Sequence, residues 1–124
     1  MKVAIVGGGV MGEAMLGAAL AQGVFAPADV TVAEVLAPRR ADLEAKHKVA
    51  TTATAGEAIS DADLVIVSVK PQDMKGVKGA LKPAALLLSV MAGVRIATLE
   101  AEFHHDRIVR VIDPQPVQRL VEIG

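Results

Sequence analysis

Three glycines near the amino terminus have the spacing of a phosphate-binding turn. Gly7, Gly9 and Gly12 form the pattern G-x-G-x-x-G, which follows the apolar run 3–6 and opens a helical pattern near Val10. The first glycine permits a tight turn, the second lets the backbone approach a diphosphate, and the third lets the helix pack closely on the strand. The start of the helix adds unpaired N–H groups and a positive dipole end. The pattern predicts a dinucleotide site; the alternative is a tight turn with a purely structural role.

An acidic residue follows at the distance expected for ribose recognition. Glu34 ends the second apolar run, about 20 residues after the last glycine, where a carboxylate accepts hydrogen bonds from the adenosine ribose. The alternative is an ordinary solvated carboxylate. Because a carboxylate repels a 2′-phosphate, Glu34 predicts a preference for NADH over NADPH. Arg39 and Arg40 come shortly afterwards, and we expect them on a solvated helix face, with pairing to that phosphate as the alternative.

Two further turns follow apolar runs later in the chain. Lys70-Pro71 comes after the run 64–69, and Ala92-Gly93 comes after the run 86–90. The first and fourth strands of such a topology flank its switch point, so these turns open at the same edge as the glycines. Proline favours extended geometry at Lys70, which would direct this lysine toward the nicotinamide half. The alternative is a proline that starts a helix beside a solvated lysine.

Apolar runs and helical patterns alternate along the chain. The predicted strands cover residues 3–6, 30–33, 49–51, 64–69, 86–90 and 108–112, and the predicted helices cover 10–22, 38–47, 55–59, 71–81 and 96–103. The continuously apolar run 64–69 is typical of a parallel strand covered on both faces. The alternation predicts an α/β fold with a doubly wound, mostly parallel Rossmann-type sheet of about six strands. We expect this domain to span residues 1–112, because the prolines after it cannot continue a strand, with 113–124 as an atypical tail.

Composition narrows the class of function. The 124 residues fit one domain, 52% of them are apolar, and the net charge is −1. With two Phe and no Tyr or Trp, an RNA-stacking surface is not expected, and no basic stripe indicates nucleic acid or a membrane surface. The lack of cysteine excludes thiolate catalysis and thiolate zinc sites. No apolar run reaches the roughly 18 residues of a membrane span, so we expect a soluble, cytoplasmic protein.

No residue presents itself as a proton donor. His47 lies on a charged helical pattern and is expected to be solvated, while His104 and His105 belong to a polar connector. The aspartates Asp61, Asp63 and Asp106 precede predicted strands and are expected to act in turns or caps. We therefore identify neither a catalytic residue nor a metal site.

Three motifs together resemble one family. Val-Gly-Gly-Gly-Val-Met-Gly at 6–12, Val-Lys-Pro-Gln at 69–72 and Ser-Val-Met-Ala-Gly-Val at 89–94 resemble, in order and spacing, the cofactor domain of pyrroline-5-carboxylate reductase. The likeness extends from Met1 to about Ile112. It implies NAD(P)H-dependent reduction of a small imine, 1-pyrroline-5-carboxylate, to proline. It also implies a cofactor site lined by Val6, Gly7, Gly8, Gly9, Val10, Met11, Gly12, Glu34, Val69, Lys70, Pro71, Met91, Ala92 and Gly93.

The chain departs from this family at three places. The family continues Met-Pro-Asn-Thr-Pro where this chain has the segment 112–116, it often carries an asparagine where this chain has Thr54-Ala55, and its helical second domain is missing here. We expect the chain to supply the cofactor half, and to self-associate through the face that the second domain would cover.

Two other interpretations stay open. One is a non-catalytic or truncated nucleotide-binding module. The other is an enzyme similar to β-hydroxyacid dehydrogenases or ketopantoate reductase, against which Val-Lys-Pro-Gln argues.

Overall fold

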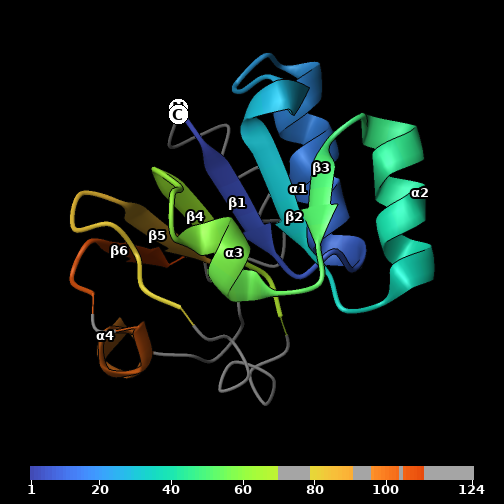
Figure 1. Ribbon diagram of the computed structural model, residues 1–124. Helices are drawn as coiled ribbons and strands as arrows, with labels where there is room; N and C mark the ends of the chain where they lie inside the picture. The colour runs from blue at the N-terminus through green and yellow to red at the C-terminus, as the bar shows by residue number, and fades with distance from the viewer. Residues whose placement is uncertain (70–78, 91–95, 104, 111–124) are drawn as a thin grey trace.

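The described residues form one parallel sheet. The computed structural model describes residues 1–69, 79–90, 96–103 and 105–110. The strands are β1 (Val3–Val6), β2 (Val30–Ala33), β3 (Ala50–Thr52), β4 (Leu64–Val67), β5 (Leu86–Ser89) and β6 (Ile108–Arg110). Their order is β3-β2-β1-β4-β5-β6, and each neighbouring pair runs parallel. The chain therefore crosses over the sheet between strands, as Figure 1 shows.

Helices cover both faces of this sheet. They are α1 (Val10–Ala21), α2 (Ala37–His47), α3 (Ala55–Ile59) and α4 (Ile96–Phe103), with a short 3₁₀ helix, η1 (Pro27–Asp29). Side chains alternate along β1: Ile5 is buried with Met15 of α1 and Leu43 of α2, whereas Val6 is buried with residues of α3 and α4. The result is a three-layer doubly wound domain. Within the part of the chain described above, no helix is long and apolar enough to cross a membrane.

The topology creates a switch point at β1. This strand pairs with β2 on one side, where Val3 lies opposite Val30, and with β4 on the other, where Val3 lies opposite Leu64. The chain leaves β1 through α1 toward β2, whereas β4 on the other side of β1 is reached from β3 through α3. A crevice therefore opens beyond the carboxyl ends of β1 and β4. The glycine turn follows β1 directly and therefore lies at this crevice.

The predicted fold class is confirmed, and several element boundaries are as expected. α3 and α4 have the predicted bounds. α1 closes at Gly23, which has a positive φ of 68°, while the Val24 N–H donates to the Ala19 oxygen at 2.9 Å. That bond and the left-handed glycine form a Schellman-type helix end.

Other boundaries differ from the prediction. β4 and β5 end at Val67 and Ser89, before the ends of their apolar runs, and β3 begins one residue late. The predicted helix 71–81 is wrong at its end: residues 79–81 are not helical, and Gly79 has a φ of 145° that a helix does not admit. Residues 71–78 and 111–124 lie outside the described residues, so the domain boundary near 112 and the tail stay predictions.

Candidate dinucleotide-binding site

The glycine turn depends on two close backbone approaches. Gly7 has a φ of 99°, and a Cβ there would lie 2.9 Å from the Ser68 oxygen. A Cβ at Gly12 would lie 2.2 Å from the Gly7 oxygen, so α1 can approach the end of β1 only without a side chain at this position. The Gly7 N–H donates to the Ala33 oxygen at 2.9 Å, which extends the β1–β2 pairing into the turn.

Gly9 faces open space. A Cβ built there meets nothing within 4 Å. Gly9 is also the N-cap of α1 and supplies no side-chain hydrogen bond, while Val10 is 89% exposed. The hydrogen bonds within α1 begin at Glu13, whose N–H donates to the Gly9 oxygen at 2.9 Å. The preceding N–H groups of the helix start have no such partner, so an anionic diphosphate fits this opening.

Glu34 lies beside the glycine turn, as its spacing predicted. Its Oε1 accepts a hydrogen bond from the Gly8 N–H at 3.2 Å, and its Oε2 accepts one from the Leu36 N–H at 3.0 Å. The carboxylate is half-buried at the carboxyl end of β2. It is thus held against the turn rather than extended into solvent.

The expectation that Arg39 and Arg40 lie on a solvated helix face is wrong. Both are half-buried. Arg39 Nη2 donates to the Gly8 carbonyl oxygen and lies 3.3 Å from Glu13 Oε1. Arg40 Nη1 donates to the Glu34 and Val35 carbonyl oxygens at 2.8 and 3.0 Å. These three carbonyls precede the starts of α1 and α2 and accept no hydrogen bond within a helix, so they are available to such donors.

The end of β4 lies against the turn. The Ser68 N–H donates to the Val6 oxygen at 2.8 Å, and a Val69 methyl group lies 3.1 Å from the Cβ position of Gly7. The buried Ser68 hydroxyl has no hydrogen-bond partner among the described residues. A buried polar atom without a partner is uncommon, and here it lies at the edge where the cofactor is expected. The predicted site residues Lys70, Pro71, Met91, Ala92 and Gly93 lie outside the described residues.

His47 is not solvated, contrary to expectation. Its side chain is only 12% exposed, and its Nε2 lies 2.9 Å from Glu13 Oε2. An ionised carboxylate only accepts hydrogen bonds, so Nε2 carries the donated hydrogen. This bond lowers the pKa of the Glu13 carboxyl, with Lys46 and Arg39 adding to the effect. One signal in the sequence could have indicated a charged partner for His47, because basic residues occupy the last turn of α2, where the helix dipole favours them.

Fold and turn together define a Rossmann-type domain with the features of a dinucleotide site. A family model described as "NADP oxidoreductase coenzyme F420-dependent" matches residues 2–93. The chain belongs to this oxidoreductase family.

Individual relatives agree with the resemblance found in the motifs. A pyrroline-5-carboxylate reductase of Pseudomonas aeruginosa is 37% identical over 120 residues, covering 93% of this chain and 44% of the relative. A reductase of the same name from Coxiella burnetii has a TM-score of 0.77 at 24% identity, over 88% of this chain and 42% of that one. Another, from Plasmodium falciparum with NADP bound, has a TM-score of 0.73 at 19% identity, covering 94% of this chain and 44% of that one. The chain thus spans less than half the length of these relatives.

Proposed function

We propose that the carboxyl edge of β1, β2 and β4 holds the NAD(P)H of a pyrroline-5-carboxylate reductase. The observation that carries this proposal is the opening at Gly9, where helix N–H groups unpaired among the described residues meet space that no described side chain fills. On this proposal residues 6–12 hold the diphosphate and Glu34 accepts the ribose hydroxyls. Val69 and the turns containing Lys70-Pro71 and Met91-Gly93 complete the nicotinamide side.

The reaction proposed for the whole protein is reduction of the C=N bond of 1-pyrroline-5-carboxylate to give proline. The bound cofactor supplies a hydride, and the role of this chain is to bind and orient it. The name of the Pseudomonas relative and its 37% identity support the substrate. We assign no catalytic residue to this chain.

We further propose that NADH binds more tightly than NADPH. The Glu34 carboxylate would repel a 2′-phosphate at the ribose, at a cost of about 1–4 kcal/mol at 4 Å. Arg39 and Arg40 already donate to backbone carbonyls, which leaves them less free to pair with that phosphate. A dissociation constant for NADPH below that of NADH would contradict this preference.

Titration of the purified chain with NADH tests the site, with Gly9→Ala as the decisive variant. Because open space surrounds Gly9 and its φ is −76°, an alanine there leaves the fold intact. Its methyl group would occupy the diphosphate position, so we expect at least about a tenfold rise in the dissociation constant at an unchanged melting temperature. Unaltered affinity of Gly9→Ala, or no binding of either dinucleotide to the unmodified chain, would refute the proposed site.

The reaction has its own test. Incubation of the protein with 1-pyrroline-5-carboxylate and NADH or NADPH should yield proline, measured directly. Cofactor binding without proline formation by the full-length protein would leave a nucleotide-binding module as the function.

Two expectations about context complete the proposal. We propose that the chain self-associates as its concentration rises, which sedimentation velocity would show as a growing fast component. We also propose a cytoplasmic location, to be tested by cell fractionation.

A further inference from the structure

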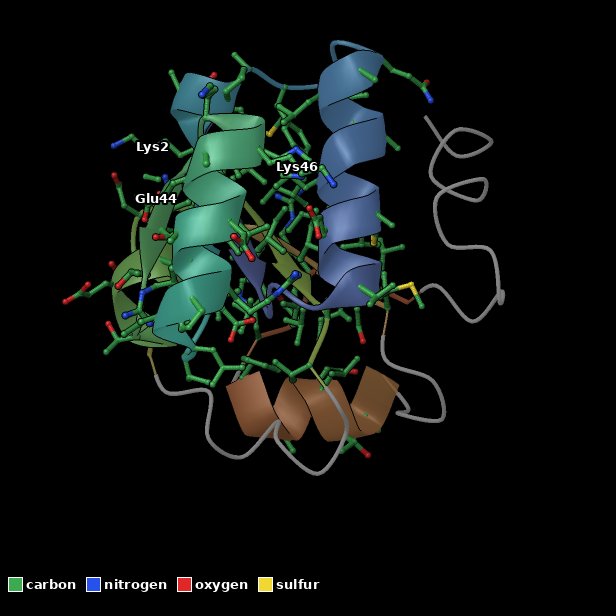
Figure 2. All side chains as sticks on the ribbon, turned by 90° about the vertical axis from the view of Figure 1, so that its right-hand side faces the viewer. Lys2, Glu44 and Lys46 are labelled. Carbon is green, nitrogen blue, oxygen red and sulfur yellow. The ribbon has the colours of Figure 1, made fainter. Side chains whose placement is uncertain are left out.

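Glu13 gathers charged side chains from the neighbouring helix. Its Oε2 lies 2.9 Å from His47 Nε2 and 3.4 Å from Lys46 Nζ, and its Oε1 lies 3.3 Å from Arg39 Nη2. All three partners belong to α2, whereas Glu13 lies in the first turn of α1. Figure 2 shows Lys46 reaching from α2 toward α1, with Glu44 on the opposite side of α2. We call Glu13, Arg39, Lys46 and His47 the Glu13 cluster.

The cluster differs from a surface ion-pair group in its burial. The side chains of Glu13 and His47 are 21% and 12% exposed, and that of Arg39 is 33% exposed, whereas Lys46 is 70% exposed. Exposed ion pairs contribute little to stability, because solvent screens their charges and because long side chains lose entropy when they are held in one geometry. Partly buried, hydrogen-bonded pairs are screened less and hold a fixed geometry. Lys46 is therefore the member whose contact is weakest.

One member of the cluster touches the glycine turn. Arg39 Nη2 donates to the Gly8 carbonyl oxygen, while the Gly8 N–H donates to Glu34 Oε1 at 3.2 Å. Side chains following β2 thus hold Gly8 through both its N–H and its carbonyl oxygen. Glycine has more backbone freedom than any other residue, so a peptide in this turn needs outside contacts to keep one orientation.

We propose that Glu13 and Arg39 are positioning residues of the dinucleotide site. Glu13 fixes the Arg39 guanidinium, and Arg39 fixes the Gly8 carbonyl, so that the turn presents its N–H groups in one orientation to the diphosphate. This inference rests on the function proposed above. It differs from a direct role of Arg39 at a 2′-phosphate, because the diphosphate is common to NADH and NADPH and both should depend equally on the turn.

The test compares dissociation constants for NADH and NADPH, with melting temperatures, in four variants. We expect Arg39→Met to raise both constants by about tenfold, the size of one lost hydrogen bond to a charged group. Glu13→Gln keeps the side-chain volume but loses the charge that holds Arg39, and we expect a rise of about threefold to tenfold for both. Arg39→Lys should bind more weakly than the wild type, because a compact, flexible ammonium lacks the rigid guanidinium that sets Nη2 between the Gly8 oxygen and Glu13. Lys46→Met is the matched control, with less than about a twofold effect.

The outcomes separate the alternatives. A loss of affinity confined to NADPH in Arg39→Met would make Arg39 a phosphate ligand and overturn the proposal. Lower melting temperatures of Arg39→Met and Glu13→Gln with unchanged affinities would overturn the proposal and give these residues a structural role. A loss of affinity in Lys46→Met as large as in Arg39→Met would also overturn it, because the net charge alone would then explain the effect. If Arg39→Met fails to fold, Glu13→Gln decides by the same criteria. A wild-type chain that binds neither dinucleotide refutes the proposed function itself, which is a different result from unaffected variants.

Discussion

The glycines of the turn have different physical requirements, as their positions in the motif predicted. Gly7 needs a positive φ, Gly12 needs the absence of a Cβ for close packing, and Gly9 needs neither for folding. The known geometry of such turns predicted this division of roles, but a spacing pattern does not contain the particular atoms that each glycine approaches. The structure assigns Gly7 and Gly12 to folding and leaves Gly9 facing outward.

Replacing Gly12 should therefore destabilise the protein. In Gly12→Ala the new methyl carbon would lie 2.2 Å from the Gly7 oxygen, so α1 or the turn must shift. We expect a loss of about 1–3 kcal/mol in the free energy of unfolding, as for other overpacked sites. Urea denaturation followed by circular dichroism measures this loss. Gly9→Ala serves as the control, and a Gly12→Ala variant as stable as Gly9→Ala would show that the close approach carries no energetic weight.

Contacts between residues far apart in the sequence explain which side chains the sequence analysis misplaced. The spacing of Glu34 from the glycines was sufficient to place it, because the strand and helix between them have standard lengths. Arg39 could not be placed in this way, since its partner is a backbone carbonyl 31 residues away. His47 was misjudged for a similar reason: the helix that carries it is polar, and its partner Glu13 lies 34 residues away on another helix.

At the scale of elements, apolar runs were good guides to strands and poorer guides to strand ends. β4 ends at Val67, whereas the predicted strand continued through the polar Ser68 to Val69. Ser68 and Val69 instead lie against the glycine turn, close to the Cβ position of Gly7. The end of α1 was predicted better, because Gly23 marks a helix end through its own backbone geometry.

Leu43 is the one residue of α2 that is buried, with 1% of its surface exposed. This side chain also lies under the turn, because its Cδ1 is 2.7 Å from the Cβ position of Gly8. We expect Leu43→Ala to lower the free energy of unfolding by about 2–4 kcal/mol, and also to weaken NADH binding through the loosened turn. Chemical denaturation and a binding titration measure the two effects. Ala41→Ser on the exposed side of α2 is the control, and full NADH affinity in Leu43→Ala would show that the turn holds its shape without α2.

At the scale of the whole molecule, charged groups join the strand starts at the edge opposite the crevice. The Lys2 N–H and Lys82 Nζ both donate to Asp63, at 2.8 and 2.7 Å, and Lys2 Nζ pairs with Asp61. These contacts lower the pKa of Asp63, through Lys82 first, and that of Asp61, through Lys2, while Asp61 raises the pKa of Lys2. The expected role of both aspartates at strand entrances agrees with this arrangement.

These shifts predict how stability depends on pH. A carboxyl whose pKa is lower in the folded state stabilises the protein above its unfolded pKa, near 3.8 for aspartate, and loses that contribution as the pH falls further. Asp63→Asn should therefore lower the melting temperature at pH 7 and have a smaller effect at about pH 3. Because the groups are exposed, salt should reduce the difference. Scanning calorimetry at several pH values measures it, with Asp42→Asn on α2 as the control. An equal deficit at both pH values would show that Asp63 acts through something other than its charge.

The parallel register of β1 also determines the order in which the protein can assemble during synthesis. β1 is made before β4, and this strand, which pairs along one edge of β1, begins only at Leu64. At about 5–20 residues per second the ribosome needs roughly 3–12 s to reach it. During that interval β1 can pair only with β2, and its other edge presents unpaired N–H and carbonyl groups to whatever is near. The nascent chain is therefore most vulnerable to misassociation before residue 67 emerges, which makes this interval the one in which a chaperone would protect it.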